Sequence, residues 1–219
     1  MSAALFDRLA DRYDAWFDSP RGAAIFAAEV DCLRSLMPAD PSGWIEVGVG
    51  TGRFAEALGV PEGVDPSTAV LGKAAARGVR TVRAAAEELP CPSGSRSGVL
   101  LVVTLCFLGA PGPAMAEFAR VLRDGGRLLV GIVPADSGWG RHYRRLARQG
   151  HPFYSAATFY TCREAVDLAR AAGFRLVDQA STLAMGPDEP VREAEVVADA
   201  GPAYGFAGLL FANDAAKTT

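Results

Sequence analysis

The sequence contains few of the residues on which metal sites and redox chemistry depend. In 219 residues there are four cysteines and two histidines. The spacing of the cysteines matches neither a metal-binding nor a thiol–disulfide motif; they stand at Cys32, Cys91, Cys106 and Cys162. We therefore expect no metal in the functional site. Unpaired thiols of this kind are typical of a reducing cytoplasm.

The sequence also lacks a long apolar segment and a strong net charge. Its longest apolar run, residues 99–108, is interrupted by Thr104 and is about half as long as a membrane span. Charged residues are scattered over residues 7–14, so no signal peptide is visible. The formal net charge of −3 argues against a general binder of polyanions. We expect a cytoplasmic protein with neither a nucleic-acid nor a membrane partner.

What the sequence does have is a regular alternation of strand-like and helix-like segments, with 50% apolar residues. This composition is enough for an ample core, and the alternation predicts a parallel sheet with helices on both faces. The predicted strands are residues 45–48, 63–65, 79–83, 99–104, 127–133, 174–183 and 204–212. The predicted helices are residues 3–18, 21–37, 53–58, 67–77, 113–123 and 162–172.

We expect a single domain over residues 1–219 with three successive parts. These are an N-terminal helical cap, a Rossmann-like core with an irregular insertion that caps the pocket, and a frayed tail: residues 1–43, 44–212 with 135–160, and 213–219, respectively. Within the core, Pro113 marks the expected start of a helix and Gly125 its expected end.

The most informative segment is residues 44–52, in which a short apolar run is followed by three glycines at alternate positions. Residues 45–47 have the character of a buried strand. The glycines accept positive φ and let a ligand lie against bare backbone; they are Gly48, Gly50 and Gly52. A helix follows, and its first N–H groups would point at the ligand. This order predicts a nucleotide-binding site.

Two residues near these glycines favour a cationic adenosyl ligand over a dinucleotide. The dinucleotide fingerprint needs a third glycine where this chain has Arg53, a side chain that we expect to oppose close packing of helix on strand. Glu46, at the end of the first strand, would repel a pyrophosphate and attract a sulfonium or ammonium group. An NAD-dependent oxidoreductase is the rival enzyme.

Asp65 stands at the end of the second predicted strand. In nucleotide-binding folds, an acidic residue at this place accepts hydrogen bonds from the ribose hydroxyls. The alternative is that Asp65 caps the helix that begins near Thr68. The two roles are compatible.

Five segments together resemble class I S-adenosylmethionine-dependent methyltransferases of the small-molecule branch. The likeness runs over most of the chain, from about residue 5 to residue 183, and is carried by residues 13–17, 46–52, 63–67, 86–90 and 116–128. Residues 46–52 (EVGVGTG) are similar to the first motif of the family, and residues 86–90 (AEELP) to the tract after its third strand. One place before Ala86 and Glu87, where the family often has an acidic residue, this chain has Ala85. The resemblance then implies that adenine recognition depends more on backbone groups.

The resemblance implies a Rossmann-like three-layer α/β sandwich, with a mostly parallel seven-stranded sheet and an antiparallel last strand. It implies S-adenosylmethionine as the cofactor and S-adenosylhomocysteine (SAH) as the product. In that family Glu46 would face the amino-acid end of the cofactor, Asp65 the ribose and Glu87 the adenine. The positions implied to bind the cofactor are Tyr13, Glu46, Gly48, Gly50, Gly52, Asp65, Pro66, Ala86, Glu87 and Thr104.

Methyl transfer from a sulfonium is a direct displacement, so alignment and exclusion of water supply much of the rate without a catalytic triad. A base helps when the acceptor must lose a proton; the candidates are His142, His151 and Tyr160. The ordinary alternative for each histidine is an exposed loop residue. The candidates for contact with the acceptor are Trp16, Cys106, Phe107 and Tyr143. Their ordinary role would be core packing.

Four arginines recur at helical spacing and would form one basic stripe: Arg141, Arg144, Arg145 and Arg148. Such a stripe is ordinarily a solvated face of a helix. The functional alternative is that it contacts an anionic substrate or a nucleic acid.

The sequence therefore predicts a methyltransferase that transfers a methyl group to an N, O or S nucleophile of a small molecule. The rival from another class is a protein of the same fold that binds an adenosyl ligand or a partner without turnover. No signal indicates the oligomeric state.

Overall fold

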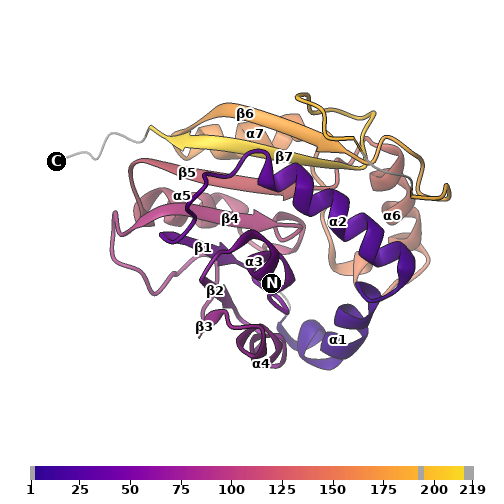
Figure 1. The fold of residues 1–219 in the computed structure, drawn as a ribbon, viewed down its shortest axis with the longest axis horizontal. Coiled ribbons are helices and arrows are strands. Elements are labelled where there is room, and N and C mark those ends of the chain that lie inside the picture. Colours follow the sequence, from indigo (N-terminus) through magenta and orange to yellow (C-terminus); the bar gives the residue numbers. More distant parts are fainter. Residues whose placement is uncertain (1–2, 192–194, 215–219) are drawn as a thin grey trace.

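The computed structural model of the chain describes residues 3–191 and 195–214. Its centre is a seven-stranded sheet with the strand order β3-β2-β1-β4-β5-β7-β6 (Figure 1). Strands β1 to β5 are parallel to one another, whereas β7 is antiparallel to both β5 and β6. The strands are β1 (Trp44–Val47), β2 (Glu62–Asp65), β3 (Arg80–Arg83), β4 (Arg96–Val102), β5 (Leu122–Ile132), β6 (Phe174–Thr182) and β7 (Phe206–Asn213).

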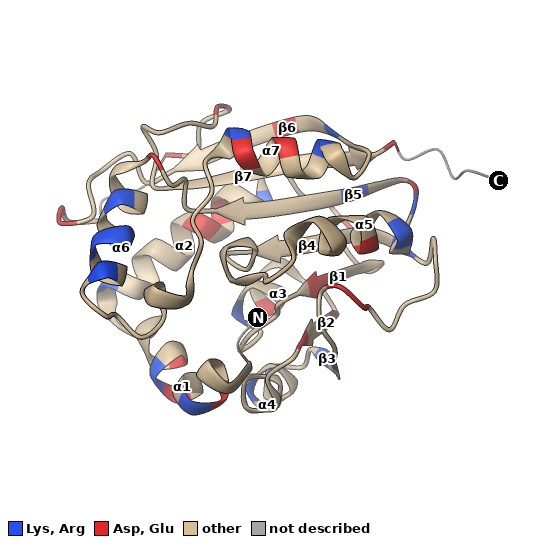
Figure 2. Cartoon of the chain, turned by 180° about the vertical axis from the view of Figure 1, so that it is seen from behind, with Lys and Arg blue, Asp and Glu red and all other residues tan. Residues whose placement is uncertain are grey.

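Helices cover both faces of this sheet. They are α1 (Ala3–Trp16), α2 (Pro20–Arg34), α3 (Arg53–Leu58), α4 (Thr68–Ala76), α5 (Pro111–Val121), α6 (Gly138–Arg148) and α7 (Cys162–Ala171), with two short 3₁₀ turns, η1 (Leu105–Phe107) and η2 (Tyr154–Ala156). Helices α2 and α3 lie on one face, and α5 and α7 lie on the other (Figures 1 and 2). The predicted three-layer, mostly parallel α/β fold with an antiparallel last strand is confirmed.

The sheet separates two apolar cores. Successive residues of a strand point to opposite faces, so that Val99 and Leu101 of β4 belong to the core under α5 and α7, whereas Leu100 and Val102 belong to the core under α2, α3 and α4. Since both faces are buried, the strand reads as a continuous apolar run rather than an alternating one. This explains the part of the apolar segment that belongs to β4, residues 99–102.

The predicted helix at 113–123 has different ends in the structure. It spans Pro111–Val121 and therefore ends before Gly125. The reason is that Leu122 already pairs with Arg96 of β4. Sheet pairing thus stops the helix, and the glycine, with φ of +68°, makes a turn within β5.

The insertion at 135–160 was expected to be irregular, and this expectation is wrong. It contains α6, whose first turn is capped by Ser137: the Ser137 hydroxyl accepts the N–H of Gly140 at 2.9 Å. Of the expected tail, Asn213 ends β7 and Asp214 forms an ion pair with Arg175 at 2.6 Å. Residues 215–219 of that tail lie outside the described residues.

Candidate functional site

A cavity of about 410 Å³ opens beyond the carboxyl ends of the parallel strands, where ligands bind in open α/β sheets. It is covered by α1, α2 and α6, which gather beyond these strand ends (Figure 1). Within the described part of the chain, it brings together five of the positions implied to bind the cofactor: Tyr13, Gly48, Gly50, Asp65 and Thr104. The other five do not line it: Glu46, Gly52, Pro66, Ala86 and Glu87.

The glycine loop is shaped by its close approach to Thr104. Gly48 has φ of +70°, and a Cβ there would lie 2.3 Å from Cγ2 of Thr104. The Thr104 hydroxyl donates to the carbonyl oxygens of Gly48 at 3.2 Å and Val102 at 3.0 Å. Thr104 is buried, so it braces the loop from below and leaves the loop backbone facing the cavity.

Asp65 receives hydrogen bonds from two backbone amides. Its Oδ2 accepts from Gly50 at 3.1 Å and its Oδ1 from Ser67 at 2.9 Å. Burial raises the pKa of Asp65, although these two hydrogen bonds act in the opposite direction. A carboxylate oxygen accepts two hydrogen bonds, so each oxygen has a further acceptor position for a ribose hydroxyl.

Helix α4 draws its capping carboxylate from elsewhere. Asp7 of α1 accepts from the Ser67 hydroxyl at 2.6 Å and from the N–H of Ala69 at 3.2 Å. At this helix end, the carboxylate of Asp65 accepts only the amide of Ser67, the residue just before α4. The cap that was the alternative role for Asp65 is thus supplied largely by Asp7.

The packing argument made for Arg53 is wrong. Its side chain turns away from the sheet, and its guanidinium pairs with Asp14 of α1 at 2.7 Å. The close approach at this turn is made one residue earlier, at Gly52, where a Cβ would lie 2.8 Å from Ala74 of α4. Gly52 is therefore a packing glycine in this fold.

Glu46 lies inside the protein beneath the loop. It is 1% exposed, and its Oε2 has no hydrogen-bond partner among the described residues. Burial raises its pKa well above the usual value. An ammonium group of a ligand reaches this carboxylate only through a shift of the loop or a bridging water, since Glu46 does not line the cavity.

The turn at 86–90 is held by two side chains of α5. Glu117 accepts the N–H of Leu89 at 2.7 Å and pairs with Arg120 at 2.6 Å. Arg120 in turn donates to the carbonyl oxygen of Leu89 at 3.3 Å. We call this arrangement of Glu117, Arg120 and Leu89 the α5 clasp. Glu117 and Arg120, which lie in the segment 116–128 that resembles the methyltransferase family, thus have a structural role.

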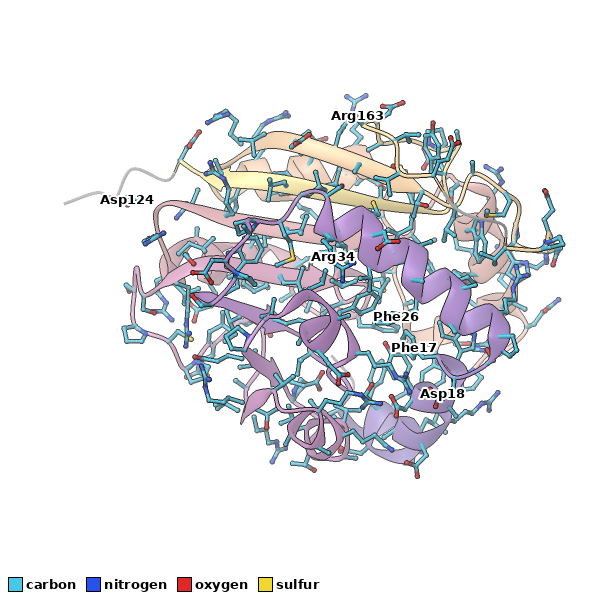
Figure 3. All side chains as sticks on the ribbon, in the orientation of Figure 1. Phe17, Asp18, Phe26, Arg34, Asp124 and Arg163 are labelled. Carbon is cyan, nitrogen blue, oxygen red and sulfur yellow. The ribbon has the colours of Figure 1, made fainter. Side chains whose placement is uncertain are left out.

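Helix α1 lies over the glycine loop. The ring of Tyr13 passes 3.7 Å from the position of a Cβ on Gly50, and it packs against Phe6, Phe17 and Phe153. Phe17 also contacts Phe26 at 5.5 Å between ring centroids, and both are labelled in Figure 3. The apolar cluster closes this end of the cavity to water.

Asp14 joins α1 to α3 and to the end of α4 through ion pairs. It pairs with Arg53 at 2.7 Å and with Arg77 at 3.0 Å, and 13% of its side chain is exposed. Burial raises the pKa of Asp14, but hydrogen bonds from Arg53, Thr51 and Arg77 outweigh it and bring the pKa to about 2.

We expect Asp14→Asn to lower the free energy of unfolding by about 2 kcal/mol at neutral pH. Because the pKa of Asp14 is lower in the folded state than in the unfolded chain, its contribution is present above about pH 4 and lost as the pH falls to about 2. Urea unfolding at several pH values measures this difference. Asp18→Asn is the matched control, since Asp18 is 68% exposed and also pairs with Arg53; its cost should stay below about 1 kcal/mol. Equal costs for both variants, or a cost independent of pH, would contradict the prediction.

All three candidate bases line the cavity: His142, His151 and Tyr160. Nδ1 of His142 lies 2.9 Å from the guanidinium of Arg145, which can only donate, so this nitrogen is occupied as an acceptor. Burial and then the charge of Arg12 lower the pKa of His151, which keeps it neutral at pH 7 and able to accept a proton. Burial raises the pKa of Tyr160, so it stays a phenol.

The four candidate acceptor contacts line the cavity as well: Trp16, Cys106, Phe107 and Tyr143. Burial raises the pKa of Cys106 to about 12. Its thiol lies 3.3 Å from the carbonyl oxygen of Val103. Cys106 therefore stays protonated and is a small, partly buried side chain rather than a reactive thiolate.

The arginine stripe of α6 faces solvent. Arg141, Arg144, Arg145 and Arg148 are all exposed, and the basic residues of this helix are visible on the outside of the molecule in Figure 2. This placement matches the ordinary interpretation of the stripe as a solvated face.

The sequence analysis missed Glu29, a cavity residue on α2. Glu29 is 7% exposed and lines the cavity, and burial raises its pKa to about 8. The signal was present in the sequence, because Glu29 stands four residues after Ile25 and four before Leu33, on the buried face of the helix. A carboxylate at such a position is unusual.

Comparisons with known proteins agree with this geometry. Residues 45–130 match a methyltransferase domain family. A solved structure from Thermotoga maritima, described as a SAM-dependent methyltransferase and possible histamine N-methyltransferase, has a TM-score of 0.89 and 33% identity. The match covers 96% of this chain and 98% of that one.

Two further relatives are uncharacterized proteins. One from Methanocaldococcus jannaschii is 32% identical, over 82% of this chain and 85% of that protein. One from Mycobacterium tuberculosis is 42% identical over 82% of this chain, and the match spans 63% of the length of the mycobacterial protein. The chain belongs to the S-adenosylmethionine-dependent methyltransferase family, and S-adenosylmethionine is its cofactor.

Proposed function

We propose that the chain acts as a single-domain methyltransferase that transfers a methyl group to an N, O or S atom of a small molecule. The observation that carries this proposal is that the glycine loop, Asp65 and an aromatic compartment share one cavity. A cofactor and an acceptor would therefore meet within it. The four unpaired cysteines support work in a reducing cytoplasm. Within the described residues, no helix is both long and apolar enough to cross a bilayer.

The residues at the loop fit an adenosyl cofactor. Bare backbone at Gly48 and Gly50 gives room for the ligand, Asp65 offers free acceptor positions to the ribose, and Tyr13 closes the site from above. When bound, S-adenosylmethionine supplies an activated methyl group: the lone pair of the acceptor bonds to the methyl carbon, and the S–C bond breaks with its electrons left on sulfur in SAH.

The task of the protein is then to align the acceptor and exclude water, which is a large source of rate by itself. The aromatic rings of α1 and of the segment around Phe153 would form an apolar wall of the cavity. Where the acceptor has to lose a proton, His151 is one of the three candidate bases that line the cavity, and its lowered pKa favours the neutral form. The description of the Thermotoga maritima protein is in keeping with nitrogen as one such acceptor atom.

Calorimetric titration with SAH, S-adenosylmethionine and NAD tests the cofactor part of this proposal. We expect SAH to bind at micromolar concentration and NAD not to bind. Asp65→Ala should weaken SAH binding at least about tenfold, or about 1.4 kcal/mol, because it removes the ribose acceptor and the hydrogen bond to Gly50. Asp167→Ala, at an exposed site on α7, is the matched control and should bind as the wild type does.

Turnover is tested separately, by release of SAH from S-adenosylmethionine in the presence of a broad set of amines, thiols and phenols. Binding of SAH with no transfer to any acceptor would favour the rival, a protein of this fold that binds an adenosyl ligand or a partner without turnover. Binding of NAD in place of SAH would favour the oxidoreductase and contradict the proposal.

A further inference from the structure

We propose that Glu29 binds a positively charged nitrogen group of the methyl acceptor, so that the acceptor is an organic cation. This inference rests on the proposed function and concerns the acceptor end of the same cavity. It identifies one specificity-determining residue and the charge of the ligand that this residue selects.

The first observation is the isolation of Glu29. Its side chain lines the cavity, yet no described residue donates a hydrogen bond to it or forms an ion pair with it. Burial alone accounts for the rise in its pKa to about 8, with no cation acting in the opposite direction. Buried carboxylates in proteins are normally paired or hydrogen-bonded. A cationic ligand would supply the missing partner.

The second observation is that Glu29 shares the cavity with Tyr13, which covers the glycine loop, and with Tyr143 on α6. Burial and then the carboxylates of Glu46 and Glu29 raise the pKa of Tyr13. Burial, with the neighbouring Tyr154 and Glu29, also raises the pKa of Tyr143. A cation bound at Glu29 would therefore lie in the same cavity as the glycine loop.

The third observation is that the aromatic rings of this cavity already accept cations on their faces. The guanidinium of Arg53 lies 5.2 Å from the ring centroid of Phe17, and that of Arg21 lies 5.6 Å from Trp139. Both rings line the same cavity as Glu29. Aromatic faces attract ammonium groups most strongly where water is excluded.

The two arginines that line the cavity do not point to an anionic acceptor. Arg21 is engaged, because its guanidinium donates to the carbonyl oxygens of Glu189, at 2.9 Å, and of Pro187. Arg12 is exposed, and its charge acts on His151. Neither contributes to the pKa of Glu29, so no arginine offers Glu29 the positive charge that a bound cation would supply.

The test is calorimetric titration of SAH-saturated protein with matched probes of different charge. We use ethylamine, 2-phenylethylamine and tryptamine, each paired with the alcohol that replaces its amine, and 3-phenylpropionate as an anion. We expect at least one amine to bind the wild type about tenfold more tightly than its alcohol does. Glu29→Gln should weaken the binding of that amine at least about tenfold and keep the affinity for the alcohol within about threefold of the wild-type value.

Two controls separate the possible failures. Asp31→Asn removes a carboxylate from the exposed side of the same helix, where it pairs with Arg34, and should not change amine binding. SAH affinity of Glu29→Gln reports whether the variant is folded. If SAH does not bind the wild type, the proposed function itself fails. If SAH binds but no amine binds more tightly than its alcohol, or Glu29→Gln binds amines as the wild type does, this inference alone is overturned.

Discussion

Gly48→Ala is expected to weaken SAH binding at least about 100-fold, or about 2.7 kcal/mol. Two costs combine at this position. The first is backbone strain, since an alanine with φ of +70° is strained by about 1 kcal/mol or more. The second is steric overlap, since its Cβ would lie 2.3 Å from Cγ2 of Thr104, and overlap of this kind costs roughly a further 1–3 kcal/mol. Thr104 cannot yield without losing its hydrogen bonds to the Gly48 and Val102 carbonyl oxygens. The loop must therefore move away from its cofactor-binding shape.

Gly78→Ala is the matched control for backbone strain. Gly78 has φ of +85°, but a Cβ there would have no atom within 4 Å. This variant should lose some stability and bind SAH within about twofold of the wild type. Adding Thr104→Ala to Gly48→Ala removes the closest contact and should restore part of the affinity. Wild-type affinity in Gly48→Ala would mean that the cofactor does not rest on this loop.

Gly98→Ala is expected to have the largest effect on stability, about 3 kcal/mol or more. Gly98 of β4 lies opposite Trp44 of β1 in the sheet, and its Cβ would come within 2.0 Å of the indole ring. Trp44 is 2% exposed and belongs to the core under α2, so it has no free space to enter. For a chain of this length, such a loss lowers the melting temperature by about 6–12 °C.

Thermal unfolding followed by circular dichroism measures this effect. Gly109→Ala is the control, because a Cβ at Gly109 has no atom within 4 Å; its melting temperature should stay within about 2 °C of the wild type. Trp44→Leu, introduced together with Gly98→Ala, vacates part of the overlap and should cost less than the sum of the two single changes. A melting temperature unchanged by Gly98→Ala would contradict the packing described for β1 and β4.

The fold was predictable because its signals are local. The run at 45–47, the glycines that follow it and Asp65 are close in sequence, and they meet at one edge of the sheet. The same holds for the helix at 53–58, whose predicted bounds are those of α3. Alternation of strands and helices then leaves few topologies.

The acceptor end was less predictable because it is assembled from distant segments. The helical spacing of Glu29 to Ile25 and Leu33 places it on the buried face of α2, but that it faces a cavity depends on residues of α1 and α6, which lie far away in the sequence. Helix α6 was not predicted as a helix although its four arginines recur at helical spacing, because only Trp139 and Gly140 of it are buried and it lacks a run of core-facing apolar residues. The end of α5 was misplaced because the pairing of Leu122 overrode the signal at Gly125.

The α5 clasp has a consequence for how this fold can be recombined. The turn at 86–90 is positioned by Glu117 and Arg120, which follow Leu89 by 28 and 31 residues. The contact is made to the main chain of Leu89, so it depends on the identity of Glu117 and Arg120 and not on that of residue 89, whose side chain packs in the core. In a chimera of two relatives, a crossover between β3 and α5 would separate the turn from its support. The turn at 86–90 and α5 should therefore come from the same parent, with crossovers placed before residue 84 or after α5.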